Sequence, residues 1–421
     1  MSPTINTREP AAPARRVLHT FDSLGDPTFR RLLSVAGFYY VYRTTELAVL
    51  SWLVLELTGS PFAVALVGVS RITPMFLFGL IAGSLSDRLP RKRLMAAAQV
   101  TNLCVAAAMI AILVSGNGQP WHAFAAIFIT GTTWAFDWSA RRALIADIFR
   151  GKALTNATSL DSGLVTGSNM IGPLFGTALI RLSDFGGAYM GIAALMASAL
   201  VLTLSLRVTT HQTKDPVKSS PLKHLKDAAG VMGHNPTLLA AVLLTAAFNF
   251  FGFPFMQMVP VIGRDYLGAS ELGYGVLVSG IGAGALVGSV LIATIRPAKR
   301  GTVYCFASAL FLAAAAVFAW SPWFALSLAL TFTAGLGLAG FAIMQPAMAL
   351  EAVGPHLRGR AMGAISLGIG MQAPGMLAMG GLAEFIGPRE SVTIVTLCGI
   401  GAVLLLRTIY PALRDKPDRR Q

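Results

Sequence analysis

Charged residues are scarce in this sequence. Asp, Glu, Lys and Arg together make up 12% of its 421 residues, whereas a soluble domain carries about 25%. Hydrophobic residues make up 54%, and the mean hydropathy is +0.65. Because so little charge cannot cover a water-exposed surface, the composition predicts a polytopic membrane protein.

Cysteine and histidine are also rare, and their positions exclude several kinds of site. The cysteines all lie inside apolar runs, as small buried residues do, and not as a disulfide framework or metal site requires: Cys104, Cys305 and Cys398. None of the six histidines is placed for a catalytic site at membrane depth. The chain also lacks the Gly-x-x-x-x-Gly-Lys-Ser/Thr loop of nucleotide-driven pumps. We therefore expect no cofactor, no metal and no enzyme activity.

Apolar runs of about 20 residues, long enough to span a bilayer, recur along the chain. They predict an all-α membrane protein with 12 transmembrane helices in two pseudo-symmetric six-helix bundles. The expected spans are roughly 32–55, 62–84, 94–114, 121–146, 158–181, 186–206, 238–262, 271–294, 303–320, 323–350, 361–386 and 391–410. The expected domains are a cytoplasmic tail (1–28), the first bundle (29–206), a cytoplasmic linker (207–236), the second bundle (237–411) and a second cytoplasmic tail (412–421).

Lysine and arginine are distributed unevenly between the two sides of the predicted helices. Most of the 33 lie in the tails and in the loops on the same side as the tails, whereas the opposite loops hold only Arg181, Arg264 and Arg389. Because positive loops resist translocation, both termini are expected in the cytoplasm, with the chain in a bacterial inner membrane. This topology also explains the net charge of +14. Without a nucleic-acid motif, we expect no nucleic-acid partner.

An internal repeat divides the chain at the linker. Arg150-Gly-Lys-Ala-Leu before the fifth span matches Arg358-Gly-Arg-Ala-Met before the eleventh. Gly172 and Gly380 follow these two motifs at the same distance. Two similar six-helix halves predict a pseudo-twofold bundle in which substrate binds between the halves, near the middle of the membrane.

A short basic hairpin separates the second and third predicted spans. Its order, Gly83-x-x-x-Asp87-Arg88-x-x-Arg91, resembles the loop between helices two and three of the major facilitator superfamily. The resemblance implies that Gly83, Asp87, Arg88 and Arg91 clamp the cytoplasmic face in the outward-open state. Pro90 stands where the family usually has glycine. The alternative is that the basic hairpin only fixes the topology.

Four further stretches are similar to sequences of the branch that contains bacterial siderophore and drug exporters, such as enterobactin exporters. They are 135–144, 249–254, 264–268 and 357–363. In the fifth span, Gly172-Pro173-x-x-Gly176 resembles a sequence associated with exporters that exchange substrate for protons. Thr177 replaces the second glycine of that pattern. The resemblance implies a gating role for this part of helix five.

Charged residues inside predicted spans are candidates for function, because each costs about 2.5–3.5 kcal/mol at the centre of a membrane helix. Glu46 and Asp137 are predicted to face the central cavity and to bind protons during transport. Arg43 can pair with Glu46 and Arg141 with Asp137, because residues three or four apart share a helix face. Arg71, which has no acid in its own predicted span, would hold an anionic group or act as the counter-ion of a deprotonated acid. Arg43, Arg71 and Arg141 are thus the expected charge partners in the cavity. The alternative is a static set of salt bridges.

The second half offers neutral amides and aromatic rings in place of charges. The predicted substrate-cavity residues are Asn249, Gln257, Gln345, Gln372 and Phe253. Amides can orient a ligand without selecting its charge, and phenylalanine supplies apolar surface. Each amide could instead form an interhelical hydrogen bond, and the phenylalanines could pack in the core. If they do line the cavity, an amphiphilic organic substrate fits better than a sugar or an inorganic ion.

These observations together predict a secondary active transporter. The favoured function is proton-coupled export of a small amphiphilic organic molecule, such as a drug or siderophore-like compound, by alternating access. The alternative within the same superfamily is uptake or facilitated diffusion, because an alternating fold is reversible. The expected partners are the small-molecule substrate, protons and membrane lipids, and the protein is expected to be a monomer.

Overall fold

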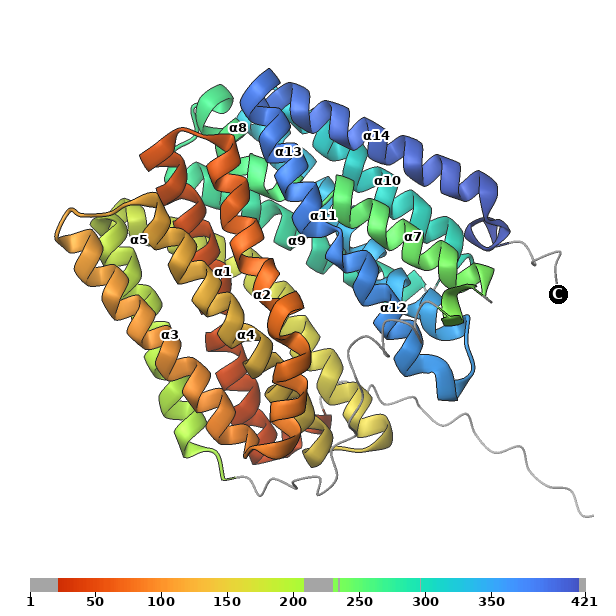
Figure 1. The fold of residues 1–421 in the computed structure, drawn as a ribbon, viewed down its shortest axis with the longest axis horizontal. Coiled ribbons are helices and arrows are strands. Elements are labelled where there is room, and N and C mark those ends of the chain that lie inside the picture. Colours follow the sequence, from red (N-terminus) through yellow and green to blue (C-terminus); the bar gives the residue numbers. More distant parts are fainter. Residues whose placement is uncertain (1–21, 208–229, 234, 296, 416–421) are drawn as a thin grey trace, which may run out of the picture.

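The computed structural model describes residues 22–207, 230–233, 235–295 and 297–415 (Figure 1). Within these ranges the chain is helical and forms no strand. The first half contains η1 (Asp22–Gly25), α1 (Pro27–Thr58), α2 (Pro61–Arg88), α3 (Arg91–Val114), α4 (Pro120–Ile148) and α5 (Gly151–Ser205). The fold is therefore the all-α membrane class that the composition predicted. Most of the expected linker at 207–236 lies outside the described residues.

The second half is built from shorter helices. They are α7 (Pro236–Phe251), α8 (Phe255–Leu267), α9 (Glu271–Ile295), α10 (Arg300–Ala319), α11 (Phe324–Glu351), η2 (Pro355–Leu357), α12 (Arg358–Gly370), α13 (Gln372–Ile386), α14 (Pro388–Ile409) and η3 (Pro411–Arg414). The predicted spans at 238–262 and 361–386 are thus each divided into two helices. Gly252 and Pro254 lie at the first division, where a missing side chain and a missing N–H weaken the helix.

Local sequence determines where helices begin and end. The side chain of Asp26 accepts hydrogen bonds from the backbone of Thr28 and Phe29, which caps the start of α1. α1 ends at Gly59, whose φ of 64° is readily adopted only by glycine. Ser60 then caps α2. The chain therefore reverses direction in two residues, which places α1 antiparallel to α2.

The number of membrane crossings is only partly fixed by the described residues. Nine helices in these ranges are long and apolar enough to cross a membrane. One of them, Ala153–Ser205, turns back at Ser183 and Asp184, where the helical dihedral angles are interrupted. α1 and α4, which are 32 and 29 residues long, carry charged residues in their middle. A total of twelve crossings stays a prediction.

The helices pack as two bundles (Figure 1). In the first, α1 lies along α5 and α2 along α4, and in the second α11 packs against α9 and α10. α8 contacts α1 and α2, but two helix pairs make the most extensive contacts between the bundles, α5 with α9 and α2 with α13. These pairs correspond under the internal repeat, because α2 and α9 come second in their halves and α5 and α12–α13 come fifth. The contact between the bundles therefore has the pseudo-twofold character that the repeat predicted.

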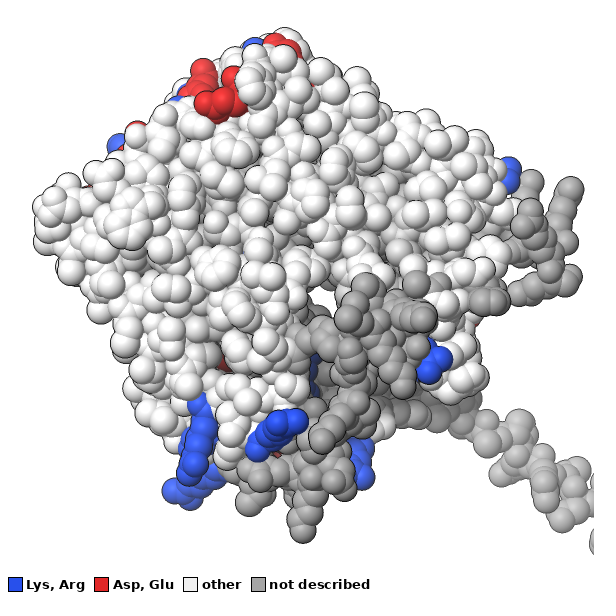
Figure 2. Space-filling view, viewed as in Figure 1, with Lys and Arg blue, Asp and Glu red and all other residues white. Residues whose placement is uncertain are grey.

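Charge separates the two ends of the helices. Lys and Arg gather along the lower edge in Figure 2, and most of the visible Asp and Glu lie along the upper edge. We call the lower end, with the α2–α3, α4–α5 and α9–α10 connections, the basic end. It carries Arg88, Lys92, Arg150 and Lys299. The opposite end, with the α1–α2 and α8–α9 connections, is called the far end.

Candidate functional site

Glu46 lies inside the first bundle, between α1 and α4. Its side chain is almost fully buried, with 1% of the residue exposed. Oε1 accepts a hydrogen bond from the Tyr42 hydroxyl at 3.2 Å, and Oε2 accepts one from Thr130 Oγ1 at 2.9 Å. Both described partners are neutral hydroxyl groups. The carboxyl group is therefore held in place without a direct ion pair.

The two arginines near Glu46 are held by other groups. The Arg43 guanidinium lies over the Trp134 ring, 3.4 Å from its centroid. Arg71 on α2 donates from Nη1 to the carbonyl oxygen of Arg43 at 2.9 Å. The expected direct pair between Arg43 and Glu46 is therefore wrong in this conformation, because Arg43 turns toward α4 while Glu46 takes two hydroxyl partners. Both positive charges are near enough to act on Glu46 through space.

Asp137 and Arg141 form the on-helix pair that their spacing predicted. Arg141 donates to Asp137 Oδ2 from Nη2 at 2.6 Å and from Nε at 3.0 Å. Both residues are 0% exposed and lie inside the first bundle, not on the surface that faces the second. The rings of Tyr39 and Tyr40 flank the guanidinium, with centroids 5.3 and 5.4 Å from its central carbon. Whether the pair titrates during transport stays a prediction.

Asp161 on α5 is a buried acid that the sequence reading did not single out. Only 2% of the residue is exposed. The Tyr40 hydroxyl donates to its carboxylate, 3.1 Å from Oδ1 and 3.2 Å from Oδ2. Asp161 lies a few residues inside the predicted span at 158–181. The rule that singled out Glu46 and Asp137, that a charged residue inside a span is a candidate for function, also applies to it.

The predicted gating residues of helix five pack tightly against α1. A methyl group added to Gly172 would lie 1.9 Å from Thr44 Oγ1, and one added to Gly176 would lie 2.9 Å from Thr45 Cγ2. The two threonines also bind α5, because Thr44 Oγ1 donates to the Ser168 carbonyl at 2.8 Å and Thr45 Oγ1 to that of Gly172 at 3.0 Å. α5 is helical through Pro173. The glycines therefore serve the contact between α1 and α5.

A stripe of small polar residues runs along the basic half of α5. Its members recur three or four residues apart and so share one helix face: Thr155, Ser159, Ser162, Thr166 and Asn169. Thr166 is half-buried and the others are exposed. The stripe leads to the point where α5 meets α9, because a methyl group on Gly282 would lie 2.7 Å from the Asn169 carbonyl oxygen. We call it the α5 polar stripe, and it faces the second bundle.

The predicted substrate residues of the second half have different surroundings. Asn249 is 1% exposed and donates from Nδ2 to the Thr245 carbonyl of its own helix at 2.8 Å. Gln345 donates to Thr245 Oγ1 at 3.3 Å. Phe253 packs against Phe248 and Phe341, with ring centroids 5.4 and 6.2 Å apart. Phe253 therefore matches the core-packing alternative, and Gln345 on α11 matches the alternative of an interhelical hydrogen bond. The hydrogen bond of Asn249 stays within α7.

Gln257 and Gln372 lie on the two second-half helices that approach α2. The Gln257 amide contacts α2 at Gly68, where an added methyl group would lie 2.8 Å from both the amide and Met376 Sδ. Gln372 is half-buried at the first residue of α13. Of the predicted cavity residues, these two and Gln345 stay candidates for contact with a ligand between the halves.

The basic hairpin is anchored within the first bundle. Arg91 bridges to Asp147 near the end of α4 and donates to the Ala143 carbonyl at 2.9 Å. Lys92 donates to the Leu204 and Leu206 carbonyls at the end of α5, at 2.7 Å each. Arg88 is exposed and Gly83 half-buried, and the side chain of Asp87 lies outside the described part. The clamp that the resemblance implies stays a prediction.

Direct polar and aromatic contacts join the two halves at the far end. Trp52 on α1 stacks on Tyr274 of α9, with ring centroids 5.4 Å apart. Arg264 donates to the Leu55 carbonyl at 2.7 Å. The other described links are Ser60 with Glu384, at 2.8 Å, and Arg181 with Glu271, at 3.5 Å. Among the described residues, the hydrogen bonds, ion pair and ring stack between the halves all lie toward this end.

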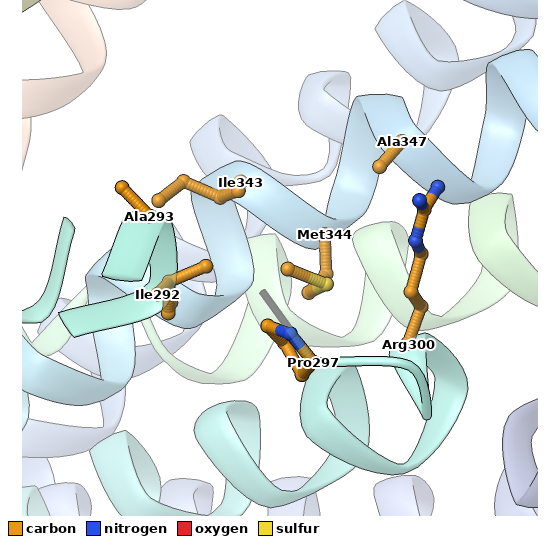
Figure 3. Close-up of a pocket in the computed structure, with 7 residues that line it drawn as sticks. All are labelled: Ile292, Ala293, Pro297, Arg300, Ile343, Met344 and Ala347. Carbon is orange, nitrogen blue, oxygen red and sulfur yellow. The ribbon is translucent and has the colours of Figure 1, made fainter. Parts of the chain in front are cut away.

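An apolar pocket of about 450 Å³ lies at the basic end of the second bundle, between α9, α10 and α11 (Figure 3). It is lined by Ile292, Ala293, Pro297, Arg300, Ile343, Met344 and Ala347. Arg300 is also paired with Glu351 on α11. None of the predicted site residues lines this pocket. The described residues also contain no group of three or more His, Cys, Asp or Glu side chains that could hold a metal.

Residues 32–371 match the family model of the Major Facilitator Superfamily. The match covers most of the chain, on both sides of the linker. The chain belongs to this superfamily. The resemblance to this superfamily that the hairpin sequence showed is therefore confirmed.

Three curated superfamily relatives are transporters of bacteria. Macrolide efflux protein A of Streptococcus pyogenes is 23% identical over 59% of this chain and 61% of that protein. The multidrug transporter MdfA of Edwardsiella ictaluri is 25% identical over 81% of this chain and 82% of its own length. The staphyloferrin A transporter of Staphylococcus aureus is 22% identical over 58% of this chain and 61% of that protein. The chain thus spans about three fifths of the length of two of these relatives.

Solved structures of superfamily transporters share the fold. The nucleoside transporter NupG superposes with a TM-score of 0.66 at 17% identity, over 93% of this chain and 100% of that one. A bacterial homologue of the human lysosomal transporter Spinster gives a TM-score of 0.68 at 15% identity, over 93% and 98% of the two chains. At these identities the likeness establishes the fold alone.

Proposed function

We propose that this superfamily member is a proton-coupled exporter of small amphiphilic organic molecules. The observation that carries the proposal is Glu46, a carboxyl group buried at membrane depth with only hydroxyl groups as described direct partners. A hydroxyl can donate to a carboxylate and accept from a carboxylic acid, so this site accommodates both forms of Glu46. Asp137, in contrast, is bound directly by Arg141, which favours its charged form. Glu46 is therefore the preferred coupling residue.

The orientation of the chain supports loading of substrate from the cytoplasm. The positive-inside rule supports a cytoplasmic basic end, with both termini on that side of a bacterial inner membrane. The described links between the halves lie at the far end, so this conformation is closed to the outside. The exposed members of the α5 polar stripe lie on the basic half of α5, on the cytoplasmic side in this orientation. An exporter would bind its substrate in this state.

The names of the relatives support export of an organic compound. Macrolide efflux, multidrug transport and staphyloferrin A transport are activities of those proteins, and here they define a class of candidate substrates. Gln257, Gln345 and Gln372 would orient such a compound through neutral hydrogen bonds. In the cycle, Glu46 would take up a proton when the far end opens and release it to the cytoplasm when substrate binds. Uptake or facilitated diffusion by the same fold is the alternative.

Accumulation in inverted membrane vesicles tests this proposal. A labelled macrolide is added to vesicles energised by respiration, which acidifies their interior. The proposal predicts accumulation that a protonophore abolishes and that Glu46→Gln removes. Asp184→Asn, a change in an exposed loop at the far end, is the matched control and should accumulate the compound normally. Equilibration of the compound without accumulation would favour facilitated diffusion.

A further inference from the structure

Asp161 stands at the border between the buried interior of the first bundle and the α5 polar stripe. Its carboxylate points at the Tyr40 hydroxyl on α1. The next residue, Ser162, is an exposed member of the stripe. Asp161 is therefore one residue away from the face of α5 that looks across to the second bundle. Glu46 and Asp137 have no such neighbour on their own helices.

Arg141 is fully buried beside Asp137 and near Asp161. Arg141 binds Asp137 directly, and its charge also acts on Asp161. The charged and titratable groups that face this cluster are Tyr39, Tyr40 and Arg43 from α1, Asp137, Arg141 and Arg142 from α4, and Asp161 from α5. α3 contributes only the neutral amides of Gln99 and Asn102.

The other two arginines are engaged elsewhere. Arg43 lies on the Trp134 ring, and Arg142 is exposed, 4.1 Å from the centroid of Trp138. Two buried carboxylates therefore depend on one buried guanidinium, Arg141. A buried charge without a partner is costly, so we expect one of the two carboxyl groups to bind a proton.

The cluster also contains polar atoms that lack protein partners. Asp137 Oδ1 and Arg141 Nη1 are buried and have no hydrogen-bond partner among the described residues. The Gln99 amide lies beside Asp137, and Asn102 lies beside Tyr39. The Nη1 group of Arg141 is therefore available to donate a hydrogen bond to a second carboxylate of the cluster.

We propose that Asp161 is a proton-binding residue of this transporter, and that Tyr40 and Arg141 link its protonation to Asp137. This inference rests on the proton coupling proposed above. Asp161 takes up a proton from the side of the α5 polar stripe, whose member Ser162 is its neighbour. Its neutral form does not attract Arg141, which then binds Asp137 alone, as it does in this conformation. When Asp161 releases the proton and regains its charge, the guanidinium of Arg141 is drawn toward both carboxylates.

Infrared difference spectroscopy on the purified protein in lipid nanodiscs tests the inference without a substrate. Spectra taken across a pH series show the carbonyl band of each carboxyl group that gains a proton. We expect a band that is absent from Asp161→Asn and present in Asp184→Asn, which changes an exposed loop acid. Tyr40→Phe keeps the ring but removes the hydroxyl, and it should move the midpoint of the band by about one pH unit.

Two results would overturn the inference. One is a set of carboxyl bands that Asp161→Asn leaves unchanged, which would show that Asp161 does not titrate. The other is a midpoint that Tyr40→Phe does not move, which would break the link to the cluster. Compound-driven proton release in proteoliposomes separates this inference from the proposed function. If the wild type shows no compound-driven proton release but the Asp161 band is present, proton coupling is rejected and proton binding by Asp161 is retained. If Asp161→Asn still releases protons when the compound is added, the role of Asp161 is rejected and the coupling is retained.

Discussion

Trp52 and Tyr274 stack across the two halves of the molecule, with their rings 5.4 Å apart and inclined by 14°. Each is 3% exposed. Trp52 belongs to α1 and Tyr274 to the first turn of α9. The stack lies at the far end, near the bond from Arg264 to the Leu55 carbonyl. These contacts close the far end and so define which conformation the chain adopts here.

Removing the stack should weaken closure of the far end. An aromatic pair of this kind contributes about 1 kcal/mol beyond its buried area, so Trp52→Ala should raise the fraction of far-end-open molecules about five-fold. Electron–electron distance measurements between spin labels on the α1–α2 and α13–α14 connections report this fraction. Trp121→Ala, at a site 62% exposed, is the control. Equal distance distributions in Trp52→Ala and wild type would contradict the assignment.

Gly275 provides the space that Thr177 occupies. A methyl group at Gly275 would lie 1.8 Å from Thr177 Oγ1. Gly275→Ala should therefore destabilise the α5–α9 contact by about 1–3 kcal/mol and reduce transport. Thr177→Gly in the same chain should restore most of the loss, since it removes the colliding side chain. Thermal unfolding in nanodiscs measures the effect.

The control for this pair is Gly381→Ala, where an added methyl group meets nothing within 4 Å. It should unfold at the wild-type temperature. Additive losses in the Thr177→Gly, Gly275→Ala double variant would show that the two residues do not interact. Thr177, which replaces the second glycine of the exporter-like pattern, would then not be accommodated by Gly275 of α9.

Glu46→Gln and Asp137→Asn should fail in different ways. Glu46→Gln keeps a polar group beside Tyr42 and Thr130, so we expect wild-type thermal stability and exchange of substrate that no longer responds to pH. Asp137→Asn leaves Arg141 buried without its counter-ion, which costs about 3–5 kcal/mol. Its unfolding temperature should fall clearly. Equal stability of the two variants would show that Asp137 is not a structural partner of Arg141.

The pair between Arg91 and Asp147 should couple the basic hairpin to α4. Arg91→Ala and Asp147→Ala should each destabilise the protein, and the double variant should be little worse than either single variant. A coupling of about 0.5–3 kcal/mol is expected from a double-mutant cycle. Arg88→Ala, at an exposed position of the same hairpin, is the control. Strict additivity would mean that the contact contributes nothing.

Contacts within a helix could be predicted from sequence, and contacts between helices could not. The spacing of Asp137 and Arg141 predicts their pair, because it follows from helix geometry alone. The same rule predicted a pair of Arg43 with Glu46 that does not form. Glu46 instead binds Thr130, and that choice depends on how α1 packs against α4.

Partners from distant helices also explain the other differences. The Tyr40–Asp161 contact joins α1 to α5, and only the packed bundle brings these side chains together. Apolar runs predicted the helices because they depend on the membrane and not on side-chain packing. Matching motifs, such as those at Arg150 and Arg358, predicted the repeat. The predicted spans run through the breaks at 252–254 and 371, since an apolar run continues through both.

Compound-driven proton movement in sealed proteoliposomes is the most direct test of coupled transport. The purified protein is reconstituted without a pH gradient, and a macrolide is then added to one side while an internal dye reports pH. Coupled exchange predicts that the downhill flow of compound moves protons in the opposite direction, and that Glu46→Gln abolishes this movement while compound still exchanges. Passage of the compound with no change in internal pH would contradict proton coupling and identify the chain as a facilitator.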